Sequence, residues 1–333
     1  MRFKNIEEVV ANEVLALPLY DDHNRLLVNS GIKLTNNIIK KIENLGISGV
    51  YIDDELSKGI EIEPILDPNT QSKIIRHLKS INIDKALNDA KKIVETLKNQ
   101  KKFCDYINIK TFDNYTYEHS LSVSIYATLV AIACGFKEKE LENISLSGLL
   151  HDLGKKCIDD FILNKPDKLT DDEYEEIKKH SSFGYNIVKD DFQISATIKT
   201  TIYEHHENED GTGYPRHLKG NEIYKFAKII HIVDVYDALI SKRPYKNPLP
   251  PVKALDYIKE KTGTMFDPYY VDIFMKIVPA YPKGLMVELS NGEKGIVIEN
   301  YTGFVLRPKI RLINGKEISL KDDIEYKDIE IVK

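Results

Sequence analysis

Residues 204–215 read EHHENEDGTGYP, and they mark the point where a predicted helix gives way to a loop. His205 and His206 close an amphipathic segment, and acids, glycines, a tyrosine and a proline follow them. Adjacent side chains on a helix point about 100° apart, but both can turn toward one ion where the helix ends. The pair therefore predicts a ligand or catalytic site whose other members come from elsewhere in the chain.

The sequence around this stretch, from about residue 113 to residue 279, is a succession of helical segments. The first is an apolar segment that we expect to end at Gly135, because glycine readily adopts the left-handed conformation that closes helices. Apolar residues recur with helical spacing in each of the others. The predicted helices lie within residues 114–134, 140–154, 171–189, 195–206, 225–240, 252–263 and 267–278.

Histidines and acids recur where these predicted helices end or turn. Taken singly, each histidine is more often a hydrogen-bonded core or surface residue than a ligand. Taken together, imidazoles with adjacent carboxylates fit a two-metal site, in which a shared carboxylate bridges the ions. A carboxylate within an apolar helix, such as Asp234, also needs a cation or several donors. The candidate ligands are His119, His151, Asp152, His180, His205, His206 and Asp234.

The other four histidines lie outside this set. His231 is close to Asp234 in the sequence but has no matching partner, and we interpret it as structural. His23, His77 and His217 belong to no pattern of ligands.

Composition indicates a globular protein of two or three domains. The chain has 333 residues, 42% of them hydrophobic and 30% charged, which provides ample material for a core. A net charge of −5 argues against a general binder of nucleic-acid polymers or anionic membranes, which needs basic surface. The three cysteines form no CxxC pair, so a zinc ribbon or disulfide framework is not expected.

The sequence predicts a cytoplasmic protein. The N-terminal residues MRFKNIEEVV carry two early glutamates and lack the apolar core of a signal peptide. The most apolar run, SIYATLVAIACGF, is too short to form a transmembrane segment.

The fold class expected is mainly α, with a helical domain flanked by two small β-rich regions. Residues 1–66 read as strands around a short helix, and residues 280–333 contain two Asn-Gly hairpin signals, at Asn291–Gly292 and Asn314–Gly315. We interpret this tail as a small, barrel-like β domain. Residues 67–112 read as a helical linker, either with an ordinary solvated face or as an element for a homodimer.

In their order and spacing, these residues resemble the signature of the HD-GYP family, a branch of the HD-domain phosphohydrolases that cleaves cyclic di-GMP. The resemblance covers roughly residues 113–279. It rests on the seven candidate ligands together with Lys155 and the run Gly213–Tyr214–Pro215. Arg243 and Lys246, in SKRPYK, also match. The flanking regions resemble the extensions of some family members more weakly.

The resemblance implies a helical domain that holds two, sometimes three, iron or manganese ions. One ion would take His119, His151, Asp152 and Asp234; the other would take Asp152, His180, His205 and His206, and the shared Asp152 would bridge them. An activated hydroxide would then attack a phosphate of cyclic di-GMP in line, giving pGpG, GMP or both.

Residues outside the ligand set also gain roles from the resemblance. Lys155 would contact the phosphate that is cleaved, and Arg243 and Lys246 would bind phosphate. Gly213, Tyr214 and Pro215 would shape the pocket.

One departure from the family pattern concerns the number of metals. Members with three ions carry a glutamate four residues before the first histidine, one helical turn away. Tyr115 occupies that position here, and Glu118 lies about 100° around the helix from His119. The sequence therefore predicts two metals.

Three alternatives to this function remain open. The chain could be an inactive receptor for cyclic di-GMP, although it has every ligand of the two-metal site. It could instead act on another cyclic dinucleotide such as cyclic GMP-AMP, because the motifs do not choose between the bases. A purely structural helical protein would leave the matched ligands unexplained.

Overall fold

The computed structural model describes residues 1–20, 25–47, 49–62, 64–99, 115–165, 167–241 and 248–332. Its residues fall into two compact units. A helical unit comprises Lys73–Lys101 and Tyr115–Phe274, and a unit rich in strands contains Met1–Ser72 and Met275–Lys333. The mainly α fold class with small antiparallel sheets near both ends of the chain is confirmed.

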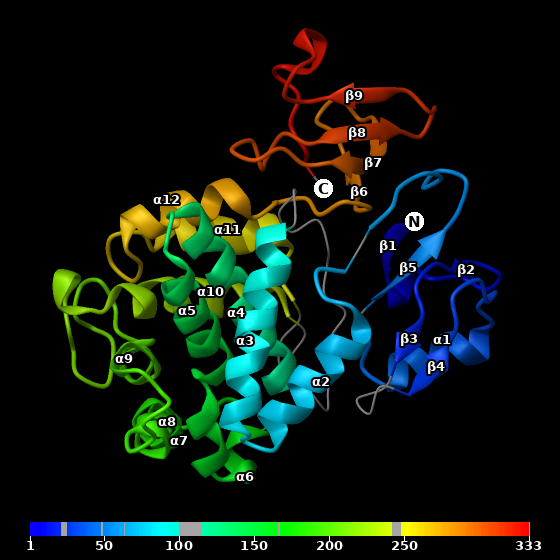
Figure 1. Cartoon of the computed structure of the whole chain (residues 1–333). Helices are drawn as coiled ribbons and strands as arrows, with labels where there is room; N and C mark the ends of the chain where they lie inside the picture. The colour runs from blue at the N-terminus through cyan, green and yellow to red at the C-terminus, as the bar shows by residue number, and fades with distance from the viewer. Residues whose placement is uncertain are drawn as a thin grey trace. The chain divides into compact units, whose positions relative to one another are not determined.

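The helical unit contains the predicted helices with small changes in their limits (Figure 1). Gly135 adopts a φ of +74° two residues after the helix Tyr115–Ala133 ends, so the predicted left-handed end of that helix is confirmed. The helices are α3 (Ile83–Asn99), α4 (Tyr115–Ala133), α5 (Glu138–Leu150), α6 (Asp160–Leu163), α7 (Asp171–Lys178), α8 (His180–Val188), α9 (Ala196–Glu204), α10 (Lys225–Ile240), α11 (Pro251–Glu260) and α12 (Pro268–Ile277), with short 3-10 turns at η2 (Leu153–Cys157) and η3 (Gly220–Glu222).

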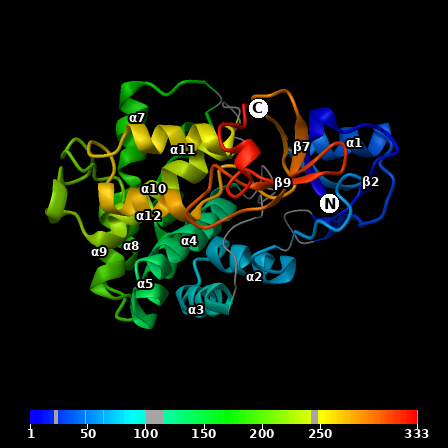
Figure 2. The same ribbon diagram turned by 90° about the horizontal axis from the view of Figure 1, so that it is seen from above.

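The interior of this unit forms around α4, which packs against α3, α5 and α10 (Figure 2). Apolar and small polar side chains surround α4 on most sides, as expected for a helix inside a bundle. Gly148 of α5 lets the two helices approach closely, because a Cβ there would lie 2.5 Å from the Cα of Ser124. The Ser124 hydroxyl donates a hydrogen bond to the carbonyl of Ser145 (2.8 Å). This packing fixes the two helices that carry His119 and His151.

The predicted single helix at residues 171–189 is divided at Lys179 into α7 and α8. Two polar side chains donate hydrogen bonds to backbone carbonyls near this division. The His180 ring donates to the carbonyl of Ile177 (2.7 Å), and the Ser181 hydroxyl donates to that of Lys178 (3.2 Å). Such side-chain bonds compete with helical hydrogen bonds, which apolar periodicity alone does not reveal.

The N-terminal part of the other unit has two small antiparallel sheets. One has the order β1-β5-β2, and the other pairs β3 with β4. A short helix, α1 (Asn36–Asn44), begins with the Thr35 hydroxyl accepting from the amide of Ile38. The strands are β1 (Arg2–Asn5), β2 (Val14–Leu15), β3 (Leu19–Tyr20), β4 (Leu26–Val28) and β5 (Gly49–Asp53). Next comes α2 (Pro68–Lys79), at the boundary between the units.

The C-terminal part of the same unit is a four-stranded antiparallel sheet in the chain order β6-β7-β8-β9. Both predicted Asn-Gly hairpins are confirmed: Gly292 and Gly315 have φ values of +85° and +88° in the turns between paired strands. The strands are β6 (Met286–Glu288), β7 (Lys294–Glu299), β8 (Lys309–Leu312) and β9 (Glu317–Ser319).

The two ends of the chain share a core within this unit. Tyr51, Ile60 and Ile62 from the N-terminal part cluster with Ile296 of β7. The Arg311 guanidinium donates to the carbonyl of Lys58 (2.7 Å), and the amide of Phe3 donates to the carbonyl of Gly284 (3.0 Å). The strands of both regions therefore belong to one compact body.

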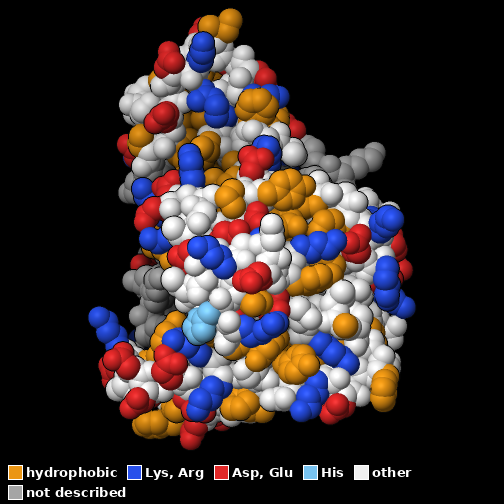
Figure 3. Space-filling model, turned by 90° about the vertical axis from the view of Figure 1, so that its left-hand side faces the viewer, with side chains coloured by type: hydrophobic (Ala, Val, Ile, Leu, Met, Phe, Trp, Pro, Cys, Tyr) orange, Lys and Arg blue, Asp and Glu red, His pale blue; other side chains and the backbone are white. Residues whose placement is uncertain are grey.

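Among the described helices, none combines the length and the apolar character needed to cross a bilayer. The face drawn in Figure 3 carries basic and acidic side chains interspersed, without a broad region of one sign.

Candidate metal centre

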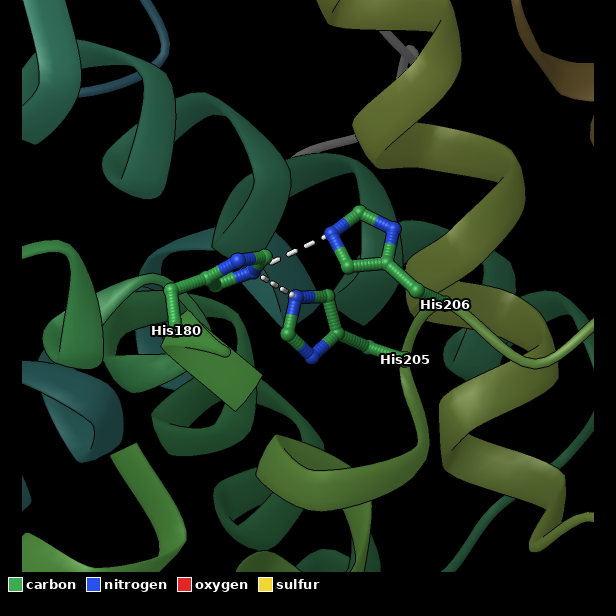
Figure 4. Close-up of side chains that lie close together, drawn as sticks. All are labelled: His180, His205 and His206. Carbon is green, nitrogen blue, oxygen red and sulfur yellow. Dashed lines mark hydrogen bonds between the residues drawn. The ribbon is translucent and has the colours of Figure 1, made fainter. Parts of the chain in front are cut away.

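Three histidine rings converge where two helices meet (Figure 4). His180 is the first residue of α8, and His205 and His206 follow directly after the last residue of α9. The Nε2 atom of His180 lies 3.1 Å from the Nε2 of His205 and 3.1 Å from the Nε2 of His206. The adjacent pair thus turns toward one point where its helix ends, as the sequence predicted.

The hydrogen bonds of two of these rings indicate which ring nitrogens carry lone pairs. The Nδ1 of His180 donates to the carbonyl of Ile177 (2.7 Å), and the Nδ1 of His205 donates to that of Ile202 (2.8 Å). In a neutral imidazole the other nitrogen then carries a lone pair. Two lone pairs 3.1 Å apart repel each other unless a cation lies between them. Two nitrogens bound at right angles to one ion lie about 3 Å apart, so the arrangement fits a metal.

A second group lies beside the first and comes from α4 and the end of α5. His119, His151 and Asp152 place one ligand atom each within 4.8 Å of one another. The His119 Nε2 lies 3.0 Å from a carboxylate oxygen of Asp234, which belongs to α10. The Nδ1 of His151 donates to the carbonyl of Gly148 (2.8 Å), and its buried Nε2 has no hydrogen-bond partner among the described residues. A buried nitrogen of this kind suits a metal ligand.

The carboxylate of Asp152 lies between the two groups. Its Oδ2 is 3.4 Å from the Nε2 of His151 and 3.7 Å from that of His119, while its Oδ1 is 3.5 Å from the Nε2 of His180. Lys155 adds a positive charge, with its Nζ 2.6 Å from the same Oδ2. Each oxygen of this side chain therefore faces a different set of imidazoles.

Burial keeps the imidazoles of the three-histidine group neutral. It lowers the pKa of His205 and His206 well below the usual value, and neighbouring imidazoles lower it further. Burial also lowers the pKa of His180 to about 4. Neutral imidazole is the form that binds metals, so this group can coordinate an ion at neutral pH.

The two carboxylates at the centre are held in their charged form. Burial alone would raise the pKa of Asp152, but Lys155 and His151 hold it well below its ordinary value. Burial acts in the same direction on the pKa of Asp234, which His119 and other nearby imidazoles likewise hold well below the usual range. The centre thus offers imidazole nitrogens and anionic carboxylate oxygens, a set that suits divalent transition metals.

Asp237 contacts the centre, although the sequence analysis did not identify it as a site residue. It lies on α10 one turn after Asp234, it is 1% exposed, and its Oδ2 is 2.7 Å from the Nδ1 of His119. A carboxylate on the far nitrogen orients a ligating imidazole and raises its basicity. The signal available in the sequence was a second acid in the apolar run that already contained Asp234.

Glu207 holds the loop after the histidine pair. Its carboxylate accepts from the amides of Arg216 (2.6 Å) and Leu218 (2.9 Å). The buried carboxylate of Glu204 accepts from the Arg216 guanidinium (3.0 Å) and from the amide of Tyr224 (3.0 Å). Both glutamates belong to the stretch EHHENEDGTGYP, yet the sequence pattern assigned them no role.

The Tyr214 ring lies against the centre as a result of this loop. It stacks on His206, with the ring centroids 4.8 Å apart and an angle of 29° between the planes. Burial raises the pKa of Tyr214, so the phenol stays neutral. Gly213 is required for the close return of the chain, because a Cβ there would lie 2.4 Å from the carbonyl oxygen of His206. The Gly213–Tyr214–Pro215 run therefore borders the histidine pair.

Several residues singled out in the sequence lie elsewhere. The imidazole of His77 pairs with Asp89 (2.7 Å), and that of His231 donates to the carbonyl of Glu207 (2.9 Å), in agreement with a structural role for His231. His217 has a φ of +56° in a loop. Outside the described residues lie His23, Arg243, Lys246 and the side chain of Tyr115. Helix α10 ends at Ile240, the last residue of the predicted helical segment.

Replacing Gly154 by alanine is expected to disrupt the centre. A Cβ at this position would lie 1.9 Å from the carbonyl oxygen of His180 and 2.4 Å from the amide nitrogen of Gly184. Because both contacts are with backbone, α8 must move and take the His180 ring with it. We expect a loss of about 2–4 kcal/mol in the free energy of unfolding and weaker metal binding, measured by denaturant titration and elemental analysis.

Gly263→Ala is the control for this change. Gly263 has a φ of +83°, and a Cβ added there would meet no described atom within 4 Å, so alanine costs only about 1–2 kcal/mol of backbone strain. Its metal content should match the wild type. Full metal content in the Gly154→Ala protein would contradict the close packing that positions His180.

Comparison with protein families gives one match over the helical unit. Residues 85–269, more than half of the chain, match the HD domain. A solved structure from Bdellovibrio bacteriovorus, the HDG"Y"P protein Bd1817, has a similar fold, with a TM-score of 0.50 and 16% identity over 82% of this chain and 97% of that one.

Curated relatives also match a large part of the chain. A Pseudomonas aeruginosa protein named cyclic di-GMP phosphodiesterase PA4108 is 37% identical over 62% of this chain and 50% of its own length. The Xanthomonas campestris cyclic di-GMP phosphodiesterase response regulator RpfG is 40% identical over 46% of this chain and 41% of its own length.

A third relative is named for a different cyclic dinucleotide. The Vibrio cholerae 3'3'-cGAMP-specific phosphodiesterase 3 is 35% identical over 46% of this chain and 33% of its own length. The chain spans about half the length, or less, of these three relatives. The family match, the shared fold and the convergent ligands lead to one conclusion: this chain belongs to the HD domain family, as its resemblance to the HD-GYP branch predicted.

Proposed function

We propose that the chain is a metal-dependent phosphodiesterase that hydrolyses cyclic di-GMP to pGpG, GMP or both. The observation that carries this proposal is the position of Asp152, whose two oxygens face two separate groups of imidazoles. A carboxylate shared in this way is typical of two-metal hydrolases. The names of the relatives supply the substrate class.

The residues present fit two divalent ions, and we propose iron or manganese. His119, His151 and Asp234 would hold one ion and His180, His205 and His206 the other, with Asp152 between them. When bound, the ions would lower the pKa of water and offset the negative charge of a phosphate. Tyr115 supplies no carboxylate for a third ion.

The remaining residues of the centre would act on the substrate directly. The Lys155 ammonium group, already beside Asp152, would approach a phosphate oxygen and stabilise the charge that grows on it during attack. Tyr214 and the adjoining Gly213 and Pro215 would form a wall of the pocket beside His206. Arg243 and Lys246 would bind the second phosphate of the substrate.

The test is a product assay on protein whose metal content is known. Protein prepared without oxygen and without chelator should contain about two iron or manganese ions per chain by mass spectrometry and convert cyclic di-GMP to a linear product. Binding without cleavage would favour the inactive receptor. Absence of metal after reconstitution with iron and manganese would contradict the centre itself, and three ions per chain would contradict the role given to Tyr115.

A second candidate substrate is cyclic GMP-AMP. Three Vibrio cholerae relatives with 34–36% identity are named as specific for 3'3'-cGAMP. The same preparation should therefore be incubated with both cyclic dinucleotides. A larger kcat/KM for cyclic GMP-AMP than for cyclic di-GMP would identify cyclic GMP-AMP as the preferred substrate. The proposed metal chemistry would stay the same.

Lys155→Ala is expected to lower turnover more than substrate binding. The ammonium group would act on charge that develops in the transition state, so its loss should reduce kcat by about 100-fold and change KM little. Arg243→Ala should chiefly raise KM. Steady-state kinetics on cyclic di-GMP measures both effects.

Lys156→Ala is the matched control for Lys155→Ala. The Lys156 ammonium group donates to the carbonyl of Lys79 (2.6 Å), whereas that of Lys155 contacts the carboxylate of Asp152. Its removal should leave kcat near the wild-type value. Equal changes in kcat and KM for Lys155→Ala and Arg243→Ala would remove the proposed division of roles.

We also propose a cytoplasmic location, and a homodimer formed through residues 67–112. Cell fractionation tests the first proposal. Light scattering on the full chain tests the second, and a mass corresponding to one chain would contradict it.

A further inference from the structure

A second aromatic ring lies near Tyr214, on helix α7. Tyr174 and Lys178 are one turn apart and share a face of this helix. The Lys178 ammonium nitrogen is 4.8 Å from the centroid of the Tyr174 ring and 5.7 Å from that of the Tyr214 ring. One cation therefore links the exposed tyrosine to the tyrosine that stacks on His206.

Tyr174 lies on the surface of the protein. It is 50% exposed, so packing in the core does not account for its position. The helix beneath it is fixed, because Thr170 and Glu173 form reciprocal capping bonds and Lys165 contacts the Glu173 carboxylate at 2.7 Å. An exposed ring on a fixed helix beside a candidate catalytic centre is a ready surface for stacking.

We propose that Tyr174 and Lys178 form a subsite for one purine nucleotide of the substrate, with the base stacked on the Tyr174 ring. This inference rests on the proposed function, because it assigns a part of the same cyclic dinucleotide. While one phosphate is at the metal centre, the molecule extends past Tyr214, and its adjoining base reaches the face of α7.

The chemistry of the two side chains matches the two parts of a nucleotide. A tyrosine ring stacks on either purine, since every base has a π-face. Lys178 offers a positive charge to a phosphate, and its present partner Glu175, at 2.5 Å, is a surface carboxylate that is 65% exposed. Exchange of such a partner costs little, because exposed ion pairs contribute little free energy. The subsite would thus favour a substrate with bases over a bare phosphodiester.

The experiment compares two substrates on metal-loaded full-length protein. Cyclic di-GMP carries purines, whereas methyl p-nitrophenyl phosphate is a phosphodiester without a base. Tyr174→Ala should raise KM for cyclic di-GMP by about 10-fold and leave kcat, metal content and cleavage of the small ester unchanged. Tyr174→Phe keeps the ring and should retain the wild-type KM. Tyr269→Ala removes another exposed tyrosine, 60% exposed on α12, and is the matched control.

The outcomes separate this inference from the proposed function. Wild-type cleavage of cyclic di-GMP with an unchanged KM in Tyr174→Ala would overturn the subsite and leave the function standing. Equal losses on both substrates, or a Phe variant as impaired as the Ala variant, would also overturn it. Cleavage of the small ester but of no cyclic dinucleotide by the wild type would overturn the function and the subsite together.

Discussion

Replacing Asp152 by alanine is expected to abolish hydrolysis and to weaken the binding of both metals. The carboxylate is almost fully buried, and its two oxygens face His151 and His180 at 3.4 and 3.5 Å. Loss of an outer residue that only orients a ligand lowers metal affinity or activity by about 10–100-fold. Removal of a shared ligand should exceed that range. Metal competition with a chelator and turnover of cyclic di-GMP measure the two effects.

Two further variants test the bridging role of this carboxylate. Asp152→Asn keeps the shape of the side chain but removes its charge, so it should fold normally and still lose both metals. His77→Ala removes an imidazole that pairs with Asp89 outside the centre and should change neither turnover nor metal content. Near-normal turnover and metal content in Asp152→Ala would show that no binuclear mechanism operates.

The sequence predicted which side chains converge better than it predicted the residues that hold them in place. His205 and His206 could be recognised because two imidazoles at a helix end have few other uses, and the structure brings both rings to His180. Glu204 and Glu207 escaped notice because acids before a loop are usually solvated. Their carboxylates accept backbone amides up to twenty residues along the chain, and no local pattern encodes such contacts.

In the fold, too, features set by neighbouring residues could be predicted, whereas contacts between residues far apart in the chain could not. Helical periodicity located α4 and α10 closely, and the Asn-Gly pairs located both hairpins. The cluster of Tyr51 with Ile296 joins residues far apart in the chain, and a local hydrophobic pattern reports burial without naming the partner. The division at Lys179 depends on the hydrogen bond from His180 to Ile177, which is a property of one side chain.

Asp237 gives the second large effect that we expect. Its carboxylate lies 2.7 Å from the Nδ1 of His119 and is buried in the last turn of α10. By accepting the proton of Nδ1, it leaves the Nε2 lone pair directed toward Asp234 and Asp152, which lie at 3.0 and 3.7 Å. Because the carboxylate fixes both the tautomer and the orientation of the ring, its loss should weaken the ion held by the His119 group.

We expect Asp237→Ala to lower the affinity for one of the two ions by about 10–100-fold, with a parallel loss of turnover. Asp237→Asn should lose less, because an amide oxygen can still accept from Nδ1 but carries no charge. Chelator titration followed by elemental analysis resolves the two sites, and the ion at His180, His205 and His206 should remain. Glu140→Gln is the control, since Glu140 contacts Lys225 of α10 at 2.6 Å and lies outside the centre. If Asp237→Ala releases both ions equally or neither, His119 does not depend on this carboxylate for its position.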